Sequence, residues 1–234
     1  MKRVLITGAG AGIGLACTKK FLQDGWDVLA HYHSSKDELN RLQKEYPAKL
    51  ETIQADLSKQ PELEKFLKQL KTEKLTALVN NAGIYDLSKK AEDRIENVQG
   101  VLLVNLIAPT LIIEAVIEGM KTQTEGAIVN ISSIGAHYGS GSDNVFYGAA
   151  KRGLEAVTKT FAREGAPFQV IVNTIRPGVT NTDFHRKAGK DVQKRIANIP
   201  IKRLVEPEDV AALVFLACSN PCVTNQIITI SGGE

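Results

Sequence analysis

The stretch VLITGAGAGIGLA, residues 4–16, passes from a short apolar run into a turn with several glycines and then into a segment of helical character. Gly8, Gly12 and Gly14 have the spacing G-x-x-x-G-x-G, which differs from the more common G-x-G-x-x-G. Glycines in such a turn let backbone N–H groups approach a phosphate, and the helix N-terminus adds partial positive charge. The stretch therefore predicts a strand, a phosphate-binding turn and a helix. It is not a P-loop, because no Gly-Lys-Ser/Thr follows; glycines that serve the turn alone are the alternative.

The same alternation of strand and helix continues along the chain. Short runs rich in Val and Ile predict strands at residues 3–7, 27–32, 50–55, 75–80, 126–132, 169–175 and 225–231. The clearest predicted helices are residues 14–24, 61–74, 101–120, a helix after Phe146, and 207–217. Seven strands that alternate with about six helices predict an α/β fold, a single-domain, doubly wound (Rossmann-type) parallel sheet with helices on both faces. We expect one domain over residues 1–234, with a lid over the site at about 178–206.

Composition restricts the class of protein. The chain has 234 residues, of which 43% are hydrophobic and 24% charged, as in an ordinary soluble domain. A net charge of +3 without a Lys/Arg block argues against a nucleic-acid partner, and three cysteines without metal-ligand spacing predict reduced thiols and no metal site. The apolar run 101–120 contains Asn105, Glu114 and Glu118, so we predict a helix buried in a core or subunit interface and no membrane span. We expect a cytoplasmic protein.

A second motif lies in NVFYGAAKRGLEA, residues 144–156, where Tyr147 stands four positions before Lys151. On a helix, residues at this spacing lie on one face. An ammonium group there favours the phenolate and lowers the tyrosine pKa from its usual value near 10. The small residues between them would let a flat ligand come close. From the pair alone, the alternative is an amphipathic helix with a half-buried tyrosine and a solvated lysine.

The end of the second predicted strand bears on the kind of dinucleotide that the turn would bind. A carboxylate at this position hydrogen-bonds the ribose 2′-hydroxyl of NAD. This chain instead has HYHSSK at residues 31–36, so hydroxyl groups and a cation stand where the acid would be. The segment favours NADP(H), with His33 and Ser34 as candidate contacts, and NAD(H) is the second choice. The alternative to a cofactor contact is that these residues only end the strand and that Ser34 or Ser35 caps the helix that follows.

With both motifs present, the chain resembles the short-chain dehydrogenase/reductase family of the classical type over residues 1–234. The resemblance depends on motifs in the family's order: TGAGAGIG at 7–14, DL at 56–57, NNAG at 80–83, Asn105, ISS at 131–133, Tyr147 with Lys151, and RPGVTNT at 176–182. The subgroup that looks most similar is the 3-oxoacyl-acyl-carrier-protein reductases. The resemblance implies an NAD(P)-dependent oxidoreductase that transfers a hydride between nicotinamide and a carbonyl/alcohol substrate.

The resemblance implies four catalytic residues. Tyr147 is similar to the family's general acid–base, and Lys151 to the residue that binds the nicotinamide ribose and lowers the tyrosine pKa. Ser133 resembles the hydroxyl that orients and polarises the substrate carbonyl, and Asn105 the residue that holds a water in a proton relay to Lys151. Ser132 is the neighbouring candidate, because strand alternation lets only one of the two serines face the site.

The resemblance also implies a set of cofactor contacts at the ends of the strands. The predicted set is Gly8, Gly12, Ile13, Gly14, His33, Ser34, Asp56, Leu57, Asn81, Ala82, Gly83, Tyr147, Lys151, Pro177, Gly178, Val179 and Thr182. Asp56 would accept from the adenine amino group, residues 81–83 would lie beside the adenosine ribose, and residues 177–182 would meet the nicotinamide carboxamide. Asn80 is expected to brace the sheet instead.

The substrate and the assembly are less closely specified. Residues 183–203 hold seven Lys/Arg and two Asp, which favours an anionic or carrier-bound substrate such as a 3-oxoacyl thioester of acyl-carrier protein or CoA. A sugar, polyol, small ketone or pteridine is the alternative substrate. A catalytically silent dinucleotide-binding sensor is disfavoured, because all four implied catalytic residues are present. The resemblance implies a homo-oligomer, a tetramer or dimer, that assembles through the helix before the fifth strand and the helix that carries Tyr147 and Lys151. The apolar run 101–120 fits such an interface.

Overall fold

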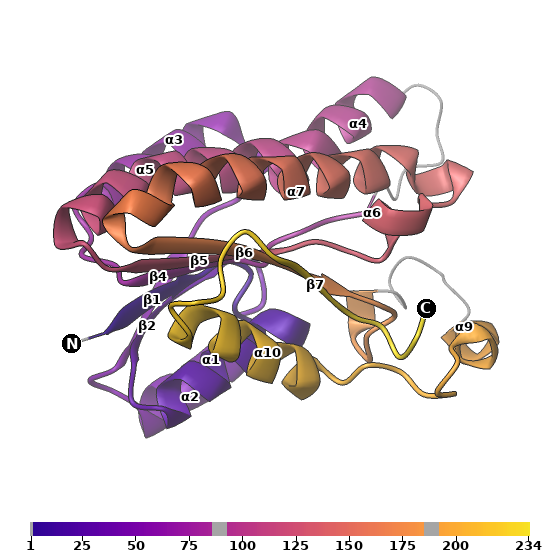
Figure 1. The fold of residues 1–234 in the computed structure, drawn as a ribbon, viewed down its shortest axis with the longest axis horizontal. Coiled ribbons are helices and arrows are strands. Elements are labelled where there is room, and N and C mark those ends of the chain that lie inside the picture. The colour runs from indigo at the N-terminus through magenta and orange to yellow at the C-terminus, as the bar shows by residue number, and fades with distance from the viewer. Residues whose placement is uncertain (1, 86–92, 185–191) are drawn as a thin grey trace.

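The computed structural model describes residues 2–85, 93–184 and 192–234. They form one seven-stranded sheet in the order β3-β2-β1-β4-β5-β6-β7, in which every neighbouring pair is parallel (Figure 1). The strands are β1 Arg3–Ile6, β2 Asp27–Tyr32, β3 Leu50–Gln54, β4 Ala77–Asn80, β5 Gly126–Ile131, β6 Val170–Pro177 and β7 Ile227–Ile230. Their ends lie within two residues of the predicted ends, and the predicted fold class is confirmed.

The helices of the described residues connect these strands. They are α1 Gly12–Gln23, α2 Asp37–Glu45, α3 Gln60–Leu70, α4 Arg94–Leu102, the π-helix η1 Leu103–Ile107, α5 Ala108–Gln123, α6 Gly135–Tyr138, α7 Val145–Gly165, α9 Val192–Asn198 and α10 Pro207–Ser219. Two short 3-10 segments, η2 Ser142–Asn144 and η3 Ala166–Phe168, precede and follow α7. The predicted helix 101–120 is therefore the middle of a longer helical run that a π-helical turn interrupts.

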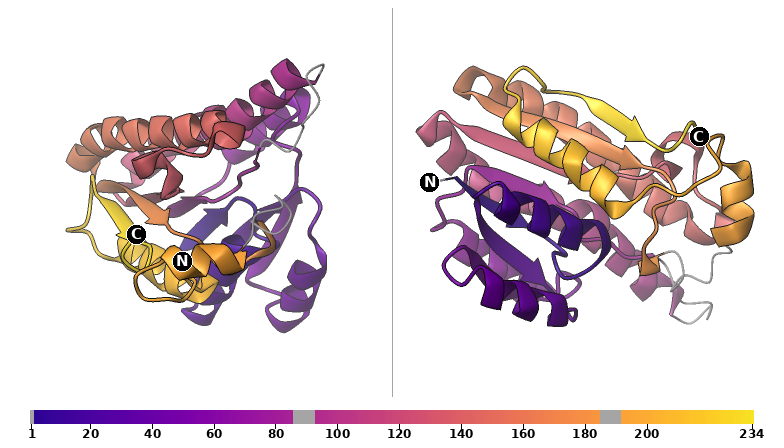
Figure 2. Two further views of the ribbon diagram at one scale, coloured as in Figure 1. Left: turned by 90° about the vertical axis from the view of Figure 1, so that its right-hand side faces the viewer. Right: turned by 90° about the horizontal axis from the view of Figure 1, so that it is seen from below.

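Helices cover both faces of the sheet and divide the core in two. One face is packed by α1, α2 and α10, and the other by α3, α5 and α7 (Figures 1 and 2). All residues of β5 and β6 are buried, as is typical of a parallel strand with helices on both sides. This explains why their sequences read as nearly continuous apolar runs instead of alternating ones.

The helical run Arg94–Gln123 is long and apolar enough to cross a membrane, with a hydropathy of 2.2. Half of its most apolar window is buried within the protein. Ile112, Ile113 and Met120 pack on the sheet in the same core as α3 and have no exposed surface. The run is therefore a core helix, as the polar residues within it predict.

A chain of buried polar side chains fixes α7 against the sheet. The Asn80 amide donates to Asn130 Oδ1 at 2.9 Å, and the Asn130 amide donates to Thr158 Oγ1 at 2.9 Å. The Thr158 and Thr174 hydroxyls lie 2.7 Å apart. These hydrogen bonds join β4, β5, α7 and β6, so Asn80 braces the sheet, as expected for this position. They also set the position of the helix that carries Tyr147 and Lys151.

Candidate active site

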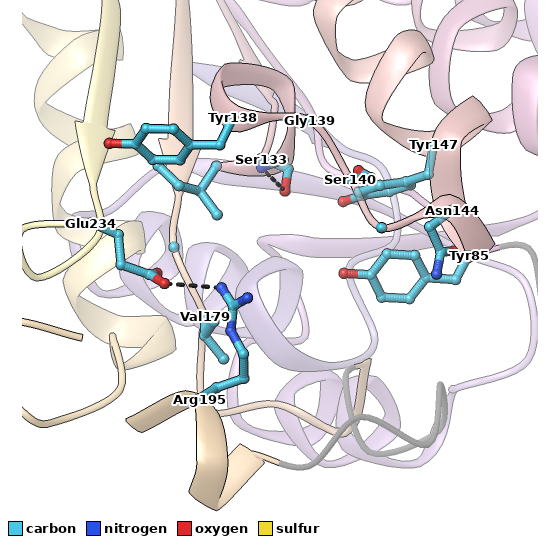
Figure 3. Close-up of a pocket in the computed structure, with 14 residues that line it drawn as sticks. Tyr85, Ser133, Tyr138, Gly139, Ser140, Asn144, Tyr147, Val179, Arg195 and Glu234 are labelled. Atoms are coloured by element: carbon cyan, nitrogen blue, oxygen red, sulfur yellow. Dashed lines mark hydrogen bonds and ion pairs between the residues drawn. The ribbon is translucent and has the colours of Figure 1, made fainter. Parts of the chain in front are cut away.

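Two adjoining cavities open at the carboxyl ends of the strands, where ligands of open α/β sheets bind. The glycine-turn cavity, of about 400 Å³, is lined by Gly8, Gly10, Ala11, His31, Tyr32, His33, Ser34, Ser35, Asp56, Leu57, Ser58, Ala82, Gly83, Ile84, Tyr85, Val104 and Phe184. The Tyr147 cavity, of about 300 Å³, is lined by Tyr85, Ser133, Ile134, Gly135, Tyr138, Gly139, Ser140, Gly141, Asn144, Tyr147, Gly178, Val179, Arg195 and Glu234 (Figure 3). Tyr85 lines both cavities, so the two are direct neighbours.

The glycine turn leaves space that side chains would fill. Gly8 and Gly12 have φ of +66° and +51°, which side chains rarely adopt, and a Cβ on Gly14 would lie 2.1 Å from the Gly8 carbonyl oxygen. Helix α1 begins at Gly12, its N-cap residue Ala11 provides no side-chain cap, and its first turn contains no acid. Neither the N-cap side chain nor an acid of the first turn therefore competes with a ligand for the backbone N–H groups at this end of α1. The turn and the helix N-terminus fit the pyrophosphate of a dinucleotide.

The turn after β4 is tied to the glycine turn. Thr7 Oγ1 accepts hydrogen bonds from the N–H groups of Asn81 and Ala82, both at 3.0 Å. The Asn81 amide donates back to the carbonyl oxygens of Thr7 and Gly8, at 2.9 and 3.1 Å. The predicted contacts of the NNAG motif thus lie beside the predicted contacts of the first turn.

His31 holds the glycine turn from the end of β2. Its Nδ1 accepts a hydrogen bond from the Gly8 N–H at 3.2 Å, and its Nε2 lies 3.0 Å from the Ala55 carbonyl oxygen. The side chain is 2% exposed, and burial lowers its pKa to about 4. The ring is therefore neutral at pH 7 and carries its proton on Nε2, where the carbonyl accepts it.

The two residues that are predicted to contact a 2′-phosphate follow β2 directly, and their side chains are exposed to solvent. His33 and Ser34 are exposed and line the glycine-turn cavity, and His33 Nε2 lies 3.6 Å from Asp56 Oδ2. No side chain caps α2, so the serines do not have the capping role that was the alternative. Lys36 places its ammonium 5.7 Å from the centre of the Tyr32 ring, so a cation also lies at this end of the cavity.

Asp56 offers one carboxylate oxygen toward this end of the cavity. Its Oδ1 accepts from the N–H and hydroxyl of Ser58, at 2.9 and 2.6 Å. Burial acts to raise the pKa of Asp56, but the Ser58 hydrogen bonds and the neighbouring His33 outweigh it and lower that pKa. Asp56 is therefore an ionised acceptor at pH 7, the state that the predicted contact with an adenine amino group requires.

Tyr147 and Lys151 are both buried on α7, with 5% and 3% of their surface exposed. The Lys151 ammonium lies 5.8 Å from the centre of the Tyr147 ring and donates to the Ile131 carbonyl oxygen at 2.9 Å. Burial raises the pKa of Tyr147 to about 12, although a hydrogen bond with Ser133 acts to lower it, and burial lowers the pKa of Lys151 to about 8. The expected lowering of the tyrosine pKa is thus not seen in the protein alone, because loss of hydration outweighs the hydrogen bond with Ser133.

The two serines after β5 point in different directions. Ser133 lines the Tyr147 cavity, and its Oγ accepts from the Gly135 N–H at 3.2 Å. The Ser132 hydroxyl donates to Glu155 Oε1 at 2.8 Å on the buried side of α7. Ser133 is therefore the serine beside the phenol, the arrangement that the strand alternation left open.

Asn105 sits in the π-helical turn η1 with no exposed surface. Its amide donates to the carbonyl oxygens of Ile84 and Val101 at 2.8 and 2.9 Å, whereas its buried Oδ1 has no hydrogen-bond partner. A Cβ on Gly83 would lie 2.9 Å from this oxygen and 3.5 Å from the Lys151 ammonium. Asn105 Oδ1 and the Lys151 ammonium therefore both lie next to Gly83, where the absence of a side chain keeps them close to each other. A proton relay between them through a water molecule would need this proximity.

Comparison with known proteins places this geometry in a family. The family model described as short chain dehydrogenase matches residues 2–193. The chain belongs to the short-chain dehydrogenase family. Over 241 aligned residues it is 34% identical to the 3-oxoacyl-acyl-carrier-protein reductase FabG of Thermotoga maritima, with 99% of this chain and 97% of that one covered.

Solved structures of family members have the same architecture. A 4-hydroxyisoleucine dehydrogenase complexed with NADH has a TM-score of 0.89 at 29% identity, with 100% of this chain and 98% of that one covered. A structure assigned as an NAD(P)-dependent gluconate 5-dehydrogenase of Beutenbergia cavernae, with bound NADP, has a TM-score of 0.88 at 30% identity and covers 99% and 96%. Members of the short-chain dehydrogenase family thus bind either dinucleotide.

The other predicted contacts of this short-chain dehydrogenase lie around the cavities. A Cβ on Gly12 would lie 3.0 Å from Thr182 Cγ2, so the lid region approaches the glycine turn. Pro177 ends β6 just before Gly178 and Val179, which line the Tyr147 cavity. Ile13 packs its side chain against the core, so it could contact a cofactor only through its backbone. Part of the predicted lid, residues 185–191, lies outside the described residues.

Several lining residues are not among the site residues that the sequence predicts. They are Gly10, Tyr85, Tyr138, Ser140, Asn144, Phe184, Arg195 and Glu234. A Cβ on Gly10 would lie 1.8 Å from the Ser35 carbonyl oxygen, so this position requires glycine. Its place in the glycine-rich turn is a signal in the sequence from which this contact could have been predicted. The Tyr85 ring contacts the rings of both Tyr147 and Phe184, with ring centres 4.5 and 4.3 Å away, which only the packing of three separate segments reveals.

The neutral state of His31 predicts how stability depends on pH. The pKa is 6.5 in an unfolded chain and about 4 in the folded protein. As pH falls from 6.5 to 4, the unfolded chain therefore binds a proton that the folded protein resists, and we expect the free energy of unfolding to drop by up to about 3 kcal/mol. Urea unfolding at a series of pH values measures this drop.

The variant His31→Gln provides the comparison, because glutamine can also donate and accept while it does not titrate. Its stability should fall less than that of the wild type over this pH range. Equal pH dependence of the two proteins would show that His31 is not the group responsible.

Proposed function

We propose that this short-chain dehydrogenase is an NAD(P)-dependent oxidoreductase that interconverts a carbonyl compound and its alcohol, with NADP(H) preferred. The main support for the proposal is that the glycine-turn cavity and the Tyr147 cavity are direct neighbours. The phenol of Tyr147 and the hydroxyl of Ser133 line one of them, at its junction with the cavity that the glycine turn borders. A dinucleotide bound along the glycine turn would extend toward these two hydroxyl groups.

The chemistry divides between cofactor and protein. When bound, the nicotinamide supplies or accepts the hydride. In the reduction, Tyr147 donates its phenolic proton to the carbonyl oxygen, and the Ser133 hydroxyl orients that oxygen by a hydrogen bond. Lys151 would bind the nicotinamide ribose hydroxyls through its buried ammonium group. The Tyr147 phenolate would then be reprotonated from the side of Lys151, and Asn105 would hold the water through which a proton returns to Lys151.

The preference for NADP(H) is supported by the end of β2. His33, Ser34 and Ser35 line the glycine-turn cavity, and the Lys36 ammonium lies over the Tyr32 ring. Hydroxyl groups and a cation suit a 2′-phosphate, whereas NAD-binding members of such folds use an acid to hold the 2′-hydroxyl. NAD(H) is the second candidate, because Asp56 adds a negative charge 3.6 Å from His33.

Two substrate classes have support. The name of the Thermotoga relative supports a 3-oxoacyl thioester on acyl-carrier protein or CoA. The names of the gluconate and 4-hydroxyisoleucine enzymes support a small polar substrate of the sugar, polyol or small-ketone kind.

We also propose a cytoplasmic homo-oligomer, a tetramer or dimer. Large apolar side chains are exposed on the helices that the resemblance assigns to the interface. Ile95 is 75% exposed on α4 and Ile107 is 44% exposed in η1. Val145 and Phe146 are exposed at the start of α7, at 51% and 36%. An exposed apolar surface of this kind is typical of a protein–protein contact.

Replacement of Tyr147 by phenylalanine tests the proposed acid. The ring and its packing are kept while the transferable proton is lost, so we expect kcat to fall by about a hundredfold to ten-thousandfold. The dissociation constant for NADPH should stay close to that of the wild type. Turnover is followed by the nicotinamide absorbance and binding by its fluorescence. Tyr46→Phe, at the end of α2 and outside both cavities, is the matched control. Near-normal turnover in Tyr147→Phe would contradict the role.

Introduction of an acid at Ser34 tests the cofactor preference. A carboxylate there should repel the 2′-phosphate and bind the free 2′-hydroxyl, so the ratio of kcat/KM for NADPH to that for NADH should fall about tenfold or more in Ser34→Asp. The control is Asn40→Asp, which adds the same charge at an exposed position on α2. Equal use of both cofactors by the wild type, or an unchanged ratio in Ser34→Asp, would refute the preference.

A further inference from the structure

Hydrogen bonds to its backbone hold the glycine turn in place, and His31 makes two of them. The Gly8 N–H donates to His31 Nδ1 at 3.2 Å, and the Ala9 N–H donates to the His31 carbonyl oxygen at 2.8 Å. On the other side, the Asn81 amide donates to the Gly8 carbonyl oxygen at 3.1 Å. Gly8 has a φ of +66°, so the chain turns sharply between these bonds. Loss of the His31 ring would free one side of this turn.

The same imidazole reaches the end of β3. Its Nε2 lies 3.0 Å from the carbonyl oxygen of Ala55, the residue before Asp56. The ring also packs against Phe66 of α3, with 4.9 Å between the ring centres. Gly8, His31 and Asp56 all line the glycine-turn cavity. The His31 ring therefore sets the distance between the glycine turn and the strand end that carries the predicted adenine contact.

The segment that follows β2 is in contact with the same turn. A Cβ on Gly10 would lie 1.8 Å from the Ser35 carbonyl oxygen, so the turn packs directly on this segment. Residues 33–35 line the glycine-turn cavity, at the place predicted for a 2′-phosphate. A change in the bond between His31 and Gly8 would therefore also alter the position of the turn relative to these residues.

Only a neutral ring can make both side-chain bonds. A neutral imidazole has one acceptor nitrogen and one donor nitrogen, whereas the protonated form has two donors. Burial has the largest influence on His31 and lowers its pKa to about 4. The neighbouring His33 acts in the same direction, while the Ala55 carbonyl oxygen and the Asp56 carboxylate oppose it. Nδ1 is therefore available at pH 7 to accept from the Gly8 N–H.

We infer that His31 is a positioning residue of the dinucleotide site, whose bond to the Gly8 N–H holds the glycine turn in the conformation that binds the pyrophosphate of the cofactor. The inference rests on the proposed binding of NAD(P) and goes beyond its predicted contacts, because His31 acts through Gly8. The alternative is a buried histidine that only stabilises the fold. The two roles differ in what a substitution changes, which is cofactor affinity in the first and stability alone in the second.

Asparagine and glutamine at position 31 separate the two side-chain bonds. The asparagine amide is attached at Cγ, as Nδ1 is, so its oxygen can still accept from the Gly8 N–H. The glutamine amide is attached at the next carbon, near the position of Nε2, so it can still donate to the Ala55 oxygen. We expect the dissociation constant for NADPH, measured by nicotinamide fluorescence, to rise about fivefold to tenfold in His31→Gln. In His31→Asn it should stay within about twofold of the wild type.

The kinetic constants should change in the same selective way. Tyr147 and Lys151 lie on α7, which is not among the elements that the His31 ring joins. We therefore expect kcat at saturating NADPH to stay within about twofold of the wild type in both variants, while KM for NADPH follows the dissociation constant.

Leu29→Ala is the control for a loss of stability. Leu29 is buried two positions before His31 on the same face of β2, and it lines neither cavity. Its truncation should lower Tm at least as much as either substitution of His31. The dissociation constant for NADPH should nevertheless stay within about twofold of the wild type.

The wild type provides a test that needs no folded variant. With isotope-labelled histidine, the chemical shifts of the ring nitrogens show which of them carries the proton. In the complex with NADP⁺, the His31 ring should be protonated on Nε2 and unprotonated on Nδ1, and its contact with the Phe66 ring identifies its signals. A His31 ring that carries its proton on Nδ1 in this complex overturns the inference.

The outcomes distinguish this inference from the proposed function. A dissociation constant that is unchanged in His31→Gln, or that rises as much in His31→Asn, overturns the inference and leaves the proposed function intact. An equal rise in Leu29→Ala also overturns it, because lost stability would then explain the effect. If the wild type binds neither NADPH nor NADH, the proposed function fails and the inference fails with it.

Discussion

Burial of an ammonium group and a phenol on one turn of α7 is the constraint on which the rest of this site depends. Water would stabilise both the ammonium and the phenolate. Burial removes this water, so it raises the pKa of Tyr147, lowers the pKa of Lys151 and favours the uncharged form of each group. The Lys151 ammonium is held by one carbonyl oxygen, that of Ile131 at the end of β5. A small displacement of α7 relative to β5 would break this bond, so the fold has to fix the helix firmly.

Buried polar contacts between α7 and the central strands provide that fixation. Toward the middle of the helix, Thr158 bonds to Asn130 and to Thr174. Nearer the site, Glu155 receives Arg176 Nε and Nη2 at 2.9 and 2.8 Å, and the Ser132 hydroxyl at 2.8 Å. Burial acts to raise the pKa of Glu155, but these hydrogen bonds outweigh it and lower that pKa, so the carboxylate is ionised at pH 7. The network joins β5, α7 and β6 one turn from Lys151.

The sequence predicts those features that are set by local pattern. Strand ends follow from apolar runs, and the glycine turn follows from residues that need positive φ or have no space for a Cβ. Family motifs then identify Tyr147, Lys151 and Ser133. The direction of the tyrosine pKa shift could not be read in this way, because spacing shows that a cation is near but not how completely both groups lose their hydration. Asn144 and Glu234 were not predicted, because their shared cavity exists only where β5, β6 and β7 end and α7 begins at the same edge of the sheet.

The central claim is that Tyr147 is an acid whose ordinary proton affinity is raised by burial and reduced by positive charge at the bound cofactor. Titration of its phenol measures this most directly, by the ultraviolet difference spectrum between the wild type and Tyr147→Phe. Without cofactor we expect a pKa of about 12. With saturating NADP⁺ we expect it to fall by about one to three units, because an opposite charge close by favours the phenolate. A phenol that titrates at the same pH in both states would contradict the account.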